Sequence, residues 1–327
     1  MNILVTGGAG FIGSNFVRYI LNKYPHYRIC NLDKLTYAGN IDNIKDTLPY
    51  HKFVIGDICN PKLVNDIMKH TDVVVHFAAE SHVDRSIQDA SAFVRTNVTG
   101  TQVLLDAAKR FDIKRFIHIS TDEVYGSITK GSFKETSPLN PSSPYSASKA
   151  AADLLVNSYY VTHGVPAIIT RSSNNFGPYQ YPEKIIPLFV TNLLEGSKVP
   201  LYGDGLNVRD WIYVLDNCRA IDAVIHNGTV GEIYNIGSGN EISNIKLTKL
   251  ILKEMGKDES FIQHVPDRPG HDRRYSLDTT KIRKLGWKPI YNFKHALKET
   301  ITWYRAVSYT HLRAHETRHD LVCRLLL

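Results

Sequence analysis

The sequence predicts an α/β protein in which a doubly wound parallel sheet is followed by a second, smaller α/β domain. Three observations lead to this prediction. Short β-branched runs alternate with helical patterns through the first half, a glycine-rich turn joins the first run to the first helix, and past about residue 176 the segments become shorter and richer in Pro, Gly and Tyr. Regular alternation of strands and helices is typical of a parallel sheet covered on both faces.

The elements of the first half follow one another in a βαβα order. The strand-like runs lie at 2–6, 28–33, 52–57, 73–78 and 115–120. A helix is expected over 14–24, directly after the first run, and further helices between the later runs. The crossovers between parallel strands are expected to be right-handed.

The chain is expected to divide near residue 175. Residues 1–175 form the larger domain and residues 176–305 the smaller one, in which helices are predicted over 185–196 and 244–256. A strand followed by a helix at 208–225 is expected to return to the larger domain.

Composition excludes several classes of protein. The formal charge is +7, but Lys and Arg are interleaved with acids and do not form the clustered basic surface of a nucleic-acid binder. The four cysteines show no CxxC spacing, which indicates neither a disulfide framework nor a thiolate metal site. No signal peptide and no run of about 18 apolar residues is visible. We therefore expect a cytoplasmic protein without membrane or nucleic-acid partners.

Residues 306–327 do not match the chain that precedes them and resemble the translation of a cloning or adaptor sequence. They contain His315, Glu316 and His319 in an HExxH pattern, which binds zinc in metalloproteases. Neither a third ligand nor the usual structural context is recognisable around this short pattern. We therefore expect no metal site and set the tail apart from the fold, with a zinc hydrolase kept as an alternative.

The glycine-rich turn predicts a dinucleotide site. Gly8, Gly10 and Gly13 fit GxGxxG, and Gly7 with the latter two fits GxxGxxG, directly between a strand and a helix. Glycines permit close backbone approach, and the helix N-terminus offers free N–H groups to a pyrophosphate. Asp33 ends the second strand-like run, where a carboxylate accepts hydrogen bonds from the adenosine ribose and favours NAD over NADP. The neighbouring Lys34 leaves the NADP alternative open.

Two further strand ends are candidates for the same site. Asp57 closes one strand-like run, and Ala78 and Ala79 close another, where they would flank the adenine and the pyrophosphate. Spacing alone equally permits that these residues are simple strand termini.

Tyr145 and Lys149 lie four residues apart at the start of a predicted helix, so their side chains share one face. An ammonium group beside a phenol stabilises the phenolate and is expected to lower the pKa of Tyr145 toward the working pH. Tyr145 is therefore a candidate general base. An ordinary helix start that happens to contain both residues is the alternative.

A second group of polar residues follows the strand-like run 115–120. Thr121, Asp122 and Glu123 come directly after its end, where open α/β sheets place their ligands. Ser120 or Thr121 could hydrogen-bond a substrate hydroxyl together with Tyr145. If their surroundings separate the pKa values of the two carboxyl groups, one serves as acid and the other as base. Capping of the next element is the structural alternative.

The chain as a whole resembles the dTDP-glucose 4,6-dehydratases of the extended short-chain dehydrogenase/reductase family. The resemblance covers residues 1 to about 305 and rests on GGAGFIG, LDKLTYAGN, AAESHVDRS, STDEVYG, YSASK, RSSNNFGPYQYPEK, VRDWIYV and DRPGHDRRY, in this order. It implies a Rossmann-type NAD-binding domain, a sugar-nucleotide domain and a homodimer. The implied reaction converts dTDP-glucose to dTDP-4-keto-6-deoxyglucose, with NAD regenerated. The chain departs from the family where the tail replaces the usual final helix.

The resemblance also implies a role for each site residue. Tyr145 would take the proton of the sugar 4-hydroxyl, assisted by Thr121 and Lys149, Glu123 would remove the C5 proton, and Asp122 would protonate the departing C6 hydroxyl. The residues expected to bind the cofactor are Gly7, Gly10, Phe11, Ile12, Gly13, Asp33, Lys34, Thr36, Asp57, Ile58, Ala78, Ala79, Ser81, Thr96, Tyr145, Lys149 and Asn175. Those expected to bind the substrate are Ser81, Thr121, Asn174, Lys184, Ile185, Pro200, Tyr202, Arg209, Asn244, Arg268 and His271.

Two other readings remain at this point. Another NAD-dependent nucleotide-sugar epimerase or dehydratase would use the same scaffold, because fold alone does not determine the reaction. An epimerase needs the Tyr/Lys pair but not the two carboxyl groups, so Glu123 argues against it. A non-catalytic NAD-binding protein would be expected to have lost one of the two sets, and both are complete.

Overall fold

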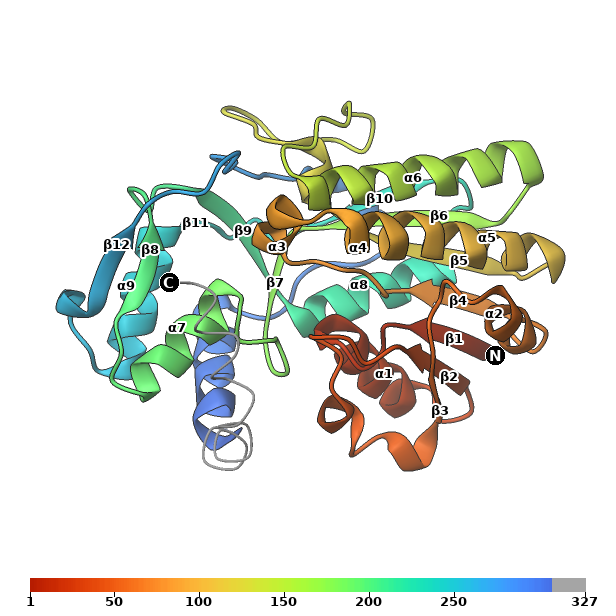
Figure 1. Ribbon diagram of the computed structural model, residues 1–327, viewed down its shortest axis with the longest axis horizontal. Helices are drawn as coiled ribbons and strands as arrows, with labels where there is room; N and C mark the ends of the chain where they lie inside the picture. The colour runs from red at the N-terminus through yellow and green to blue at the C-terminus, as the bar shows by residue number, and fades with distance from the viewer. Residues whose placement is uncertain (308–327) are drawn as a thin grey trace.

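The computed structural model describes residues 1–307, which form a large parallel sheet with helices on both faces and a smaller α/β part beside it (Figure 1). The large sheet has seven strands in the order β10-β6-β5-β4-β1-β2-β3, and all neighbouring pairs are parallel. Its strands are β1 (Asn2–Thr6), β2 (Arg28–Asp33), β3 (Lys52–Ile55), β4 (Val73–His76), β5 (Arg115–Thr121), β6 (Ala167–Ser172) and β10 (Ile233–Ile236). The predicted doubly wound parallel sheet is confirmed.

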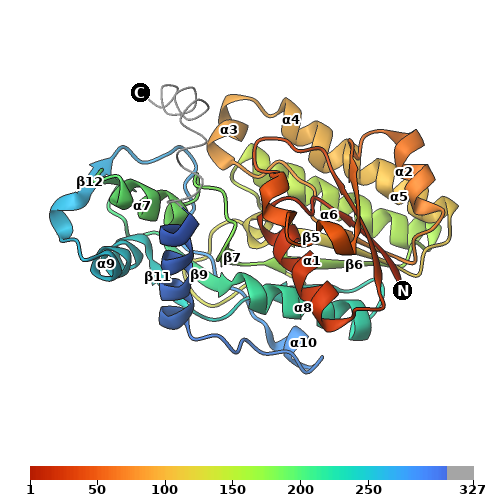
Figure 2. The ribbon, with the colours of Figure 1, turned by 90° about the horizontal axis from the view of Figure 1, so that it is seen from below.

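Alternation of side chains along β1 shows why both faces of the sheet are covered. Ile3 and Val5 pack into one core, and Leu4 packs into the other. The first core contains α1 (Phe11–Lys23) and α8 (Val214–Asn227), which lie side by side in Figures 1 and 2. The second contains α2 (Pro61–Met68), α5 (Thr101–Arg110) and α6 (Pro144–His163). Strands buried on both faces read as continuous apolar runs, as the first half of the sequence does.

The connections of the larger part contain several short helices. α3 (Val83–Gln88), α4 (Ser91–Phe93) and a π-helical segment (Val94–Gly100) lead into α5. The 3-10 segments are Ile41–Ile44, Leu48–Tyr50 and Asp122–Tyr125.

The smaller part is built from two small sheets and two main helices. β7 (Asn174–Phe176), β9 (Val208–Tyr213) and β11 (Glu241–Ser243) form one sheet, and β8 (Val199–Tyr202) pairs with β12 (Ile262–Val265) in the other. α7 (Ile185–Leu194) packs against α9 (Asn244–Met255). A 3-10 segment (Glu259–Phe261), α10 (Thr280–Arg283) and a helix over 293–307 complete the described chain.

The chain crosses between the two parts more than once. The predicted strand and helix at 208–225 correspond to β9, which pairs within the smaller part, and α8, which packs on α1 of the larger part. β10 then joins the edge of the large sheet next to β6. The numerical domain boundary near residue 175 stays a prediction.

The described residues contain no membrane-spanning helix, and they exclude most of the predicted tail. Within residues 1–307, none of the helices combines the length and apolarity that crossing a bilayer requires. The HExxH pattern at 315–319, and all of the predicted tail except its first two residues, lie outside the described residues.

Candidate active site

The glycine-rich turn lies between β1 and α1 and is packed too closely for side chains. A Cβ on Gly7 would lie 2.6 Å from the backbone nitrogen of Ala78, and one on Gly13 would lie 2.3 Å from the carbonyl oxygen of Gly7. Gly7 also has φ +72°, a conformation that favours glycine. Gly10 is the N-cap of α1, so the N–H groups of the first helical turn face the turn without an intrahelical acceptor.

Asp33 ends β2 and fixes the loops around it. Its Oδ2 accepts the N–H of Ala9 at 2.9 Å, and its Oδ1 accepts the N–H of Leu35 at 2.8 Å. Lys34, which left the choice between NAD and NADP open, forms an ion pair with Asp57 at 2.9 Å. The positive charge nearest to Asp33 in sequence is therefore already paired.

One cavity brings the predicted cofactor residues together. Every residue predicted to bind the cofactor lines it except Asn175. Asn175 lies on β7, where its Nδ2 donates to the carbonyl of Ser173 at 3.0 Å. Its Oδ1 is buried and has no hydrogen-bond partner among residues 1–307.

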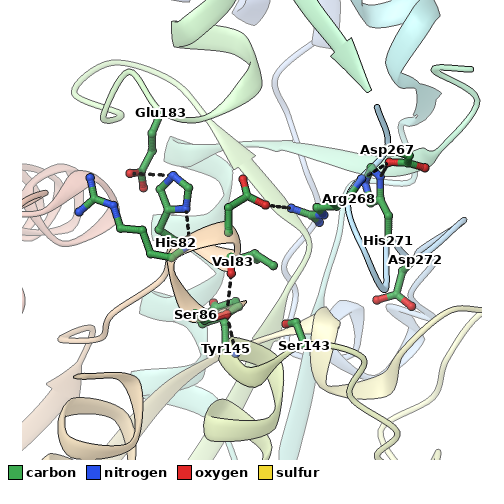
Figure 3. Close-up of polar contacts among 12 residues, drawn as sticks. His82, Val83, Ser86, Ser143, Tyr145, Glu183, Asp267, Arg268, His271 and Asp272 are labelled. Atoms are coloured by element: carbon green, nitrogen blue, oxygen red, sulfur yellow. Dashed lines mark hydrogen bonds and ion pairs between the residues drawn. The ribbon is translucent and has the colours of Figure 1, made fainter. Parts of the chain in front are cut away.

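Tyr145 and Lys149 lie in the first two turns of α6. Ser143 and Ser146 form a reciprocal capping box there, and Pro144 occupies the first helical position. The N–H of Tyr145 donates to Ser86 Oγ of α3 at 3.1 Å (Figure 3). Lys149 Nζ donates to the carbonyl of Ile119 on β5 at 2.7 Å. Both side chains are buried and line the cavity.

The prediction that the pKa of Tyr145 is lowered was wrong. The sequence predicted a lowered pKa, but burial, followed by the negative charge of Glu123, raises the pKa of Tyr145 well above its usual value. A hydrogen bond with Thr121 acts in the opposite direction. Desolvation of the phenolate therefore exceeds the stabilisation that this site alone provides.

Asp122 and Glu123 follow β5 but have different surroundings. Thr121 ends the strand, accepts the N–H of Glu123 at 3.2 Å and donates to Asp122 Oδ1 at 3.3 Å. Burial, and then the charge of Glu123, raise the pKa of Asp122 well above its usual range. Burial also raises the pKa of Glu123, but Lys184, Arg268 and Arg209 act against the rise. Asp122 is thus the carboxyl group that keeps its proton more readily.

The three cations near Glu123 come from the smaller part. Lys184 Nζ donates to the carbonyl of Ser81 at 2.9 Å. Arg209 is buried, its Nη2 donates to the carbonyl of Asp272 at 2.9 Å, and its guanidinium carbon lies 4.1 Å from the centre of the Tyr275 ring. Three basic side chains around one carboxyl group suit a substrate that carries negative charge.

Arg268 and His271 lie together on the chain that faces α3 (Figure 3). An Nη1 of Arg268 is 3.7 Å from a carboxylate oxygen of Asp84 on α3. His271 Nδ1 is 2.6 Å from Asp267 Oδ1, and its ring is 6.2 Å from that of Tyr202.

Of the predicted substrate residues, only Ser81 and Lys184 line the cavity around Tyr145, and the others lie outside it. Ile185 is the first residue of α7, next to Lys184. Asn174 begins β7, and its Oδ1 is buried without a hydrogen-bond partner in the described part of the chain. Pro200 pairs with Gln263 between β8 and β12, and Asn244 starts α9 and donates its N–H to the carbonyl of Asn207 at 2.9 Å.

The sequence did not single out the residues that join the two parts across the cavity. Tyr37 donates to Glu183 Oε1 at 3.2 Å, and the other oxygen of Glu183 is 3.4 Å from His82 Nε2 (Figure 3). Glu80, Gln180 and Tyr181 also line the cavity. These residues lie in three separate segments, after Asp33, after β4 and before α7, and no spacing indicated that they meet.

A metal site is not part of this arrangement. In the described region, no group of three or more His, Cys, Asp or Glu side chains is placed to hold a metal ion. The HExxH pattern at 315–319, from which no metal site was expected, lies outside that region.

The parallel sheet, the glycine turn and the Tyr/Lys pair define a Rossmann-type enzyme of the extended short-chain dehydrogenase/reductase class. Within that class, the family model described as GDP-mannose 4,6 dehydratase matches residues 4–300, and the chain belongs to this family.

Individual relatives are similar over nearly the whole chain. A dTDP-glucose 4,6-dehydratase of Streptomyces niveus is 55% identical, with 93% of each chain covered. A low-salt glycan biosynthesis protein, Agl12, of Haloferax volcanii is 56% identical, covering 93% of this chain and 98% of its own. The crystal structure of the dTDP-glucose 4,6-dehydratase DesIV of Streptomyces venezuelae, with NAD and TYD bound, superposes with a TM-score of 0.93. It is 52% identical and covers 94% of this chain and 98% of its own.

Proposed function

We propose that this protein is an NAD-dependent dTDP-glucose 4,6-dehydratase that forms dTDP-4-keto-6-deoxyglucose. The observation that carries this proposal is the meeting of a Tyr/Lys pair and an Asp/Glu pair at the end of β5. The first pair suits oxidation of a hydroxyl group, and the second suits elimination of water. Relatives with this activity are 55% identical over nearly the full length.

The residues around the cavity fit a bound NAD. The N–H groups of the first turn of α1 have no intrahelical acceptor and are available to a pyrophosphate, and Asp33, which lines the same cavity, would bind an adenosine ribose. Gly7, Gly10, Gly13, Asp33 and Lys149 would hold the cofactor. When bound, NAD would accept a hydride from C4 of the glucose, which becomes a ketone. Return of that hydride to C6 would regenerate NAD.

Tyr145 acts first, as the base that takes the proton of the sugar 4-hydroxyl. Its phenolate is unfavourable in the protein alone. Lys149, one helical turn away on the same face, contributes a buried positive charge, and Thr121 contributes a hydrogen bond. A positively charged nicotinamide ring in the same cavity would favour the phenolate further.

Glu123 and Asp122 then eliminate water across C5 and C6. A ketone at C4 acidifies the C5 proton, and Glu123, whose ionised form three cations favour, removes it. Asp122, which burial keeps protonated, gives its proton to the C6 hydroxyl as it leaves.

The basic side chains of the smaller part select the substrate. Arg209 and Arg268 present guanidinium groups that match the oxygens of a diphosphate, and Lys184 adds a third charge. Asn174 and Asn244 offer amide groups for the sugar or base edges. Ser81, Ile185, Pro200, Tyr202 and His271 complete the proposed substrate site.

A 4-epimerase on the same scaffold is the competing function. UDP-glucose 4-epimerases are structurally similar, as in a Thermotoga maritima enzyme with a TM-score of 0.88 and 31% identity. An epimerase needs no base for C5 and no acid for C6, so Asp122 and Glu123 would have no task in it.

We further propose a homodimer that forms through the outer faces of α5 and α6. Leu154 and Val161 of α6 are 62% and 70% exposed, and large exposed apolar side chains on one helix favour association. Light scattering should give twice the monomer mass, and Leu154→Glu should halve the measured mass. A parent protein of monomer mass would contradict the proposal.

The cytoplasmic location stays a prediction.

A comparison of three nucleotide sugars as substrates tests the proposed function. Purified protein with NAD is incubated separately with dTDP-glucose, UDP-glucose and GDP-mannose, and the products are separated by mass. We expect a product 18 mass units lighter than the substrate, the loss of one water, fastest from dTDP-glucose. An epimerised product of unchanged mass, or none from folded and NAD-loaded protein, would contradict the proposal. Tyr145→Phe provides the inactive control.

A further inference from the structure

A cluster of buried titratable side chains lies near Lys149. Its members are Asp153 on α6, His118 on β5 and Arg171 on β6, which are 1%, 0% and 3% exposed. None of the three lines the cavity around Tyr145. The steps proposed above leave this cluster without a role, although α6 carries both Lys149 and Asp153.

The geometry fixes Asp153 from two strands. Its Oδ2 accepts from Arg171 Nε at 2.9 Å, and its Oδ1 lies 3.4 Å from His118 Nε2. Arg171 is held at its other end, where Nη1 donates to the Tyr125 hydroxyl at 2.8 Å. Tyr125 in turn donates to Asn235 Oδ1 at 2.8 Å. The carboxylate therefore has little freedom to move.

Asp153 is also placed to act on Lys149. The two residues are four apart on α6, and therefore on one face of the helix. Lys149 Nζ is anchored on the carbonyl of Ile119, the neighbour of His118 on β5. Burial lowers the pKa of Lys149 to about 8. The charge of Asp153 acts in the opposite direction and favours the ammonium form.

The other titratable groups around this pair do not replace Asp153. Burial, then the charge of Lys149, lowers the pKa of His118 to about 4, and burial also lowers the pKa of His76 on β4 well below its usual value. Both are thus neutral near pH 7. Burial raises the pKa of Tyr125 to about 12, so it is neutral too. Arg171 is a cation, and the nearby carboxylate of Glu135 accepts the N–H of Asn235 at 3.1 Å.

We propose that Asp153 is a positioning residue for the dehydration, because it keeps Lys149 charged next to Tyr145. This inference rests on the proposed function, in which a buried ammonium group supports the phenolate of Tyr145. Without the carboxylate, Lys149 and Arg171 would be two buried cations with no fixed counter-charge between them. Lys149 would then lose its proton near neutral pH, and Tyr145 would lose the charge that favours its ionised form.

The direct test is an NMR titration of Lys149 in the protein without substrate. Lysine is labelled with ¹³C at Cε, and the Lys149 signal is assigned by its loss in Lys149→Met. In the parent the midpoint should lie near 8. In Asp153→Asn it should fall by about one pH unit or more, the size of effect expected from one nearby buried charge. Glu135→Gln, which removes a carboxylate on the Arg171 side only, should leave the midpoint unchanged.

Turnover is measured as a function of pH with the same proteins. The alkaline limb of kcat should move to lower pH in Asp153→Asn, by as much as the Lys149 midpoint, with little change in KM. Asp153→Glu should restore part of both values. If Asp153→Asn does not fold, the double variant Asp153→Asn/Arg171→Gln removes both buried charges and should show a smaller displacement in the same direction, because the repulsion between Arg171 and Lys149 is also removed.

Three results would overturn the proposal. One is a Lys149 midpoint that does not change in either Asp153 variant, another is an equal change in Glu135→Gln, and the third is a displaced midpoint with an unchanged kcat profile. Absence of turnover in the parent would instead contradict the proposed function, because the NMR titration needs no substrate.

Discussion

Neighbouring residues can acquire opposite tasks because their surroundings differ within a few ångströms. Asp122 and Glu123 are adjacent in sequence, yet burial and the charge of Glu123 favour the neutral form of Asp122, while three cations favour the ionised form of Glu123. The pair thus meets the requirement for an acid and a base at one site. The sequence pattern left open whether the surroundings separate the pKa values of the two carboxyl groups, because Lys184, Arg209 and Arg268 are distant in the chain. Only the family resemblance implied that Asp122 is the acid and Glu123 the base.

Replacing each carboxyl group separately should distinguish their tasks. In deuterated water, Glu123→Gln should form no product and place no deuterium at C5, because the base is missing. Asp122→Asn should slow product formation by roughly 10²–10⁴-fold, the usual effect of losing a general acid, but should still exchange the C5 proton. Mass spectrometry of substrate and product reports both quantities. The reverse pattern, with exchange lost only in Asp122→Asn, would show that the two roles are exchanged.

The buried His118 predicts sensitivity to acid. Burial lowers its folded-state pKa to about 4, whereas an unfolded histidine titrates near 6.5. Between these two values the unfolded chain binds a proton that the folded protein does not, so the free energy of unfolding falls as the pH is lowered from 6.5 toward 4. The loss attributable to this residue approaches about 3 kcal/mol at the lower end.

Denaturant unfolding at several pH values checks this expectation. His118→Gln should show a shallower decline of the free energy of unfolding between pH 6.5 and 4 than the parent. A decline of equal steepness in the two proteins would assign the acid sensitivity to other groups, such as the buried His76, whose ring centre lies 5.4 Å from that of His118.

At the scale of elements, the first half of the chain was more predictable than the second. The five strand-like runs predicted in the first half all form strands of the large sheet, β1 to β5. The first helix begins at Phe11, three residues before the predicted start, because Gly10 caps it. The predicted helices over 185–196 and 244–256 are confirmed as α7 and α9.

Apart from β9, which was predicted as the strand that begins at residue 208, the strands of the smaller part were not predicted, for a physical reason. β7 and β11 have three residues each, and β8 and β12 have four, which is too short for a pattern of alternation to develop. Their pairing depends on which segments the rest of the fold brings together. For example, β7 pairs with β9, which lies more than 30 residues later in the sequence.

The turn before α1 gives a testable prediction at this scale. Gly13→Ala would place a methyl group 2.3 Å from the Gly7 carbonyl oxygen and 2.8 Å from the Gly8 Cα, both backbone atoms that cannot move aside. We expect a loss of about 1–3 kcal/mol in the free energy of unfolding without NAD. Gly10→Ala is the matched control, because its Cβ would lie 3.3 Å from the same oxygen. Equal stability of the two variants would contradict this explanation of the glycine spacing.

At the scale of the whole molecule, the candidate site belongs to both parts of the fold. The larger part provides the cavity, the Tyr/Lys pair and the two carboxyl groups, and the smaller part provides Lys184, Arg209 and Arg268. α3 lies at the junction, where Ser86 accepts the N–H of Tyr145 and Asp84 faces Arg268 (Figure 3). Motif spacing identified the groups of the larger part. The basic residues were found through the family resemblance, since no local pattern marks them.

The central claim is that one site oxidises C4, eliminates water and reduces C6 without net oxidation. The most direct measurement follows a deuterium label placed at C4 of dTDP-glucose through turnover with NAD-loaded protein. We expect the label at C6 of the 4-keto-6-deoxy product, within the same molecule, and one solvent hydrogen at C5. Loss of the label to solvent, or its return to C4 of an epimerised sugar, would contradict the account.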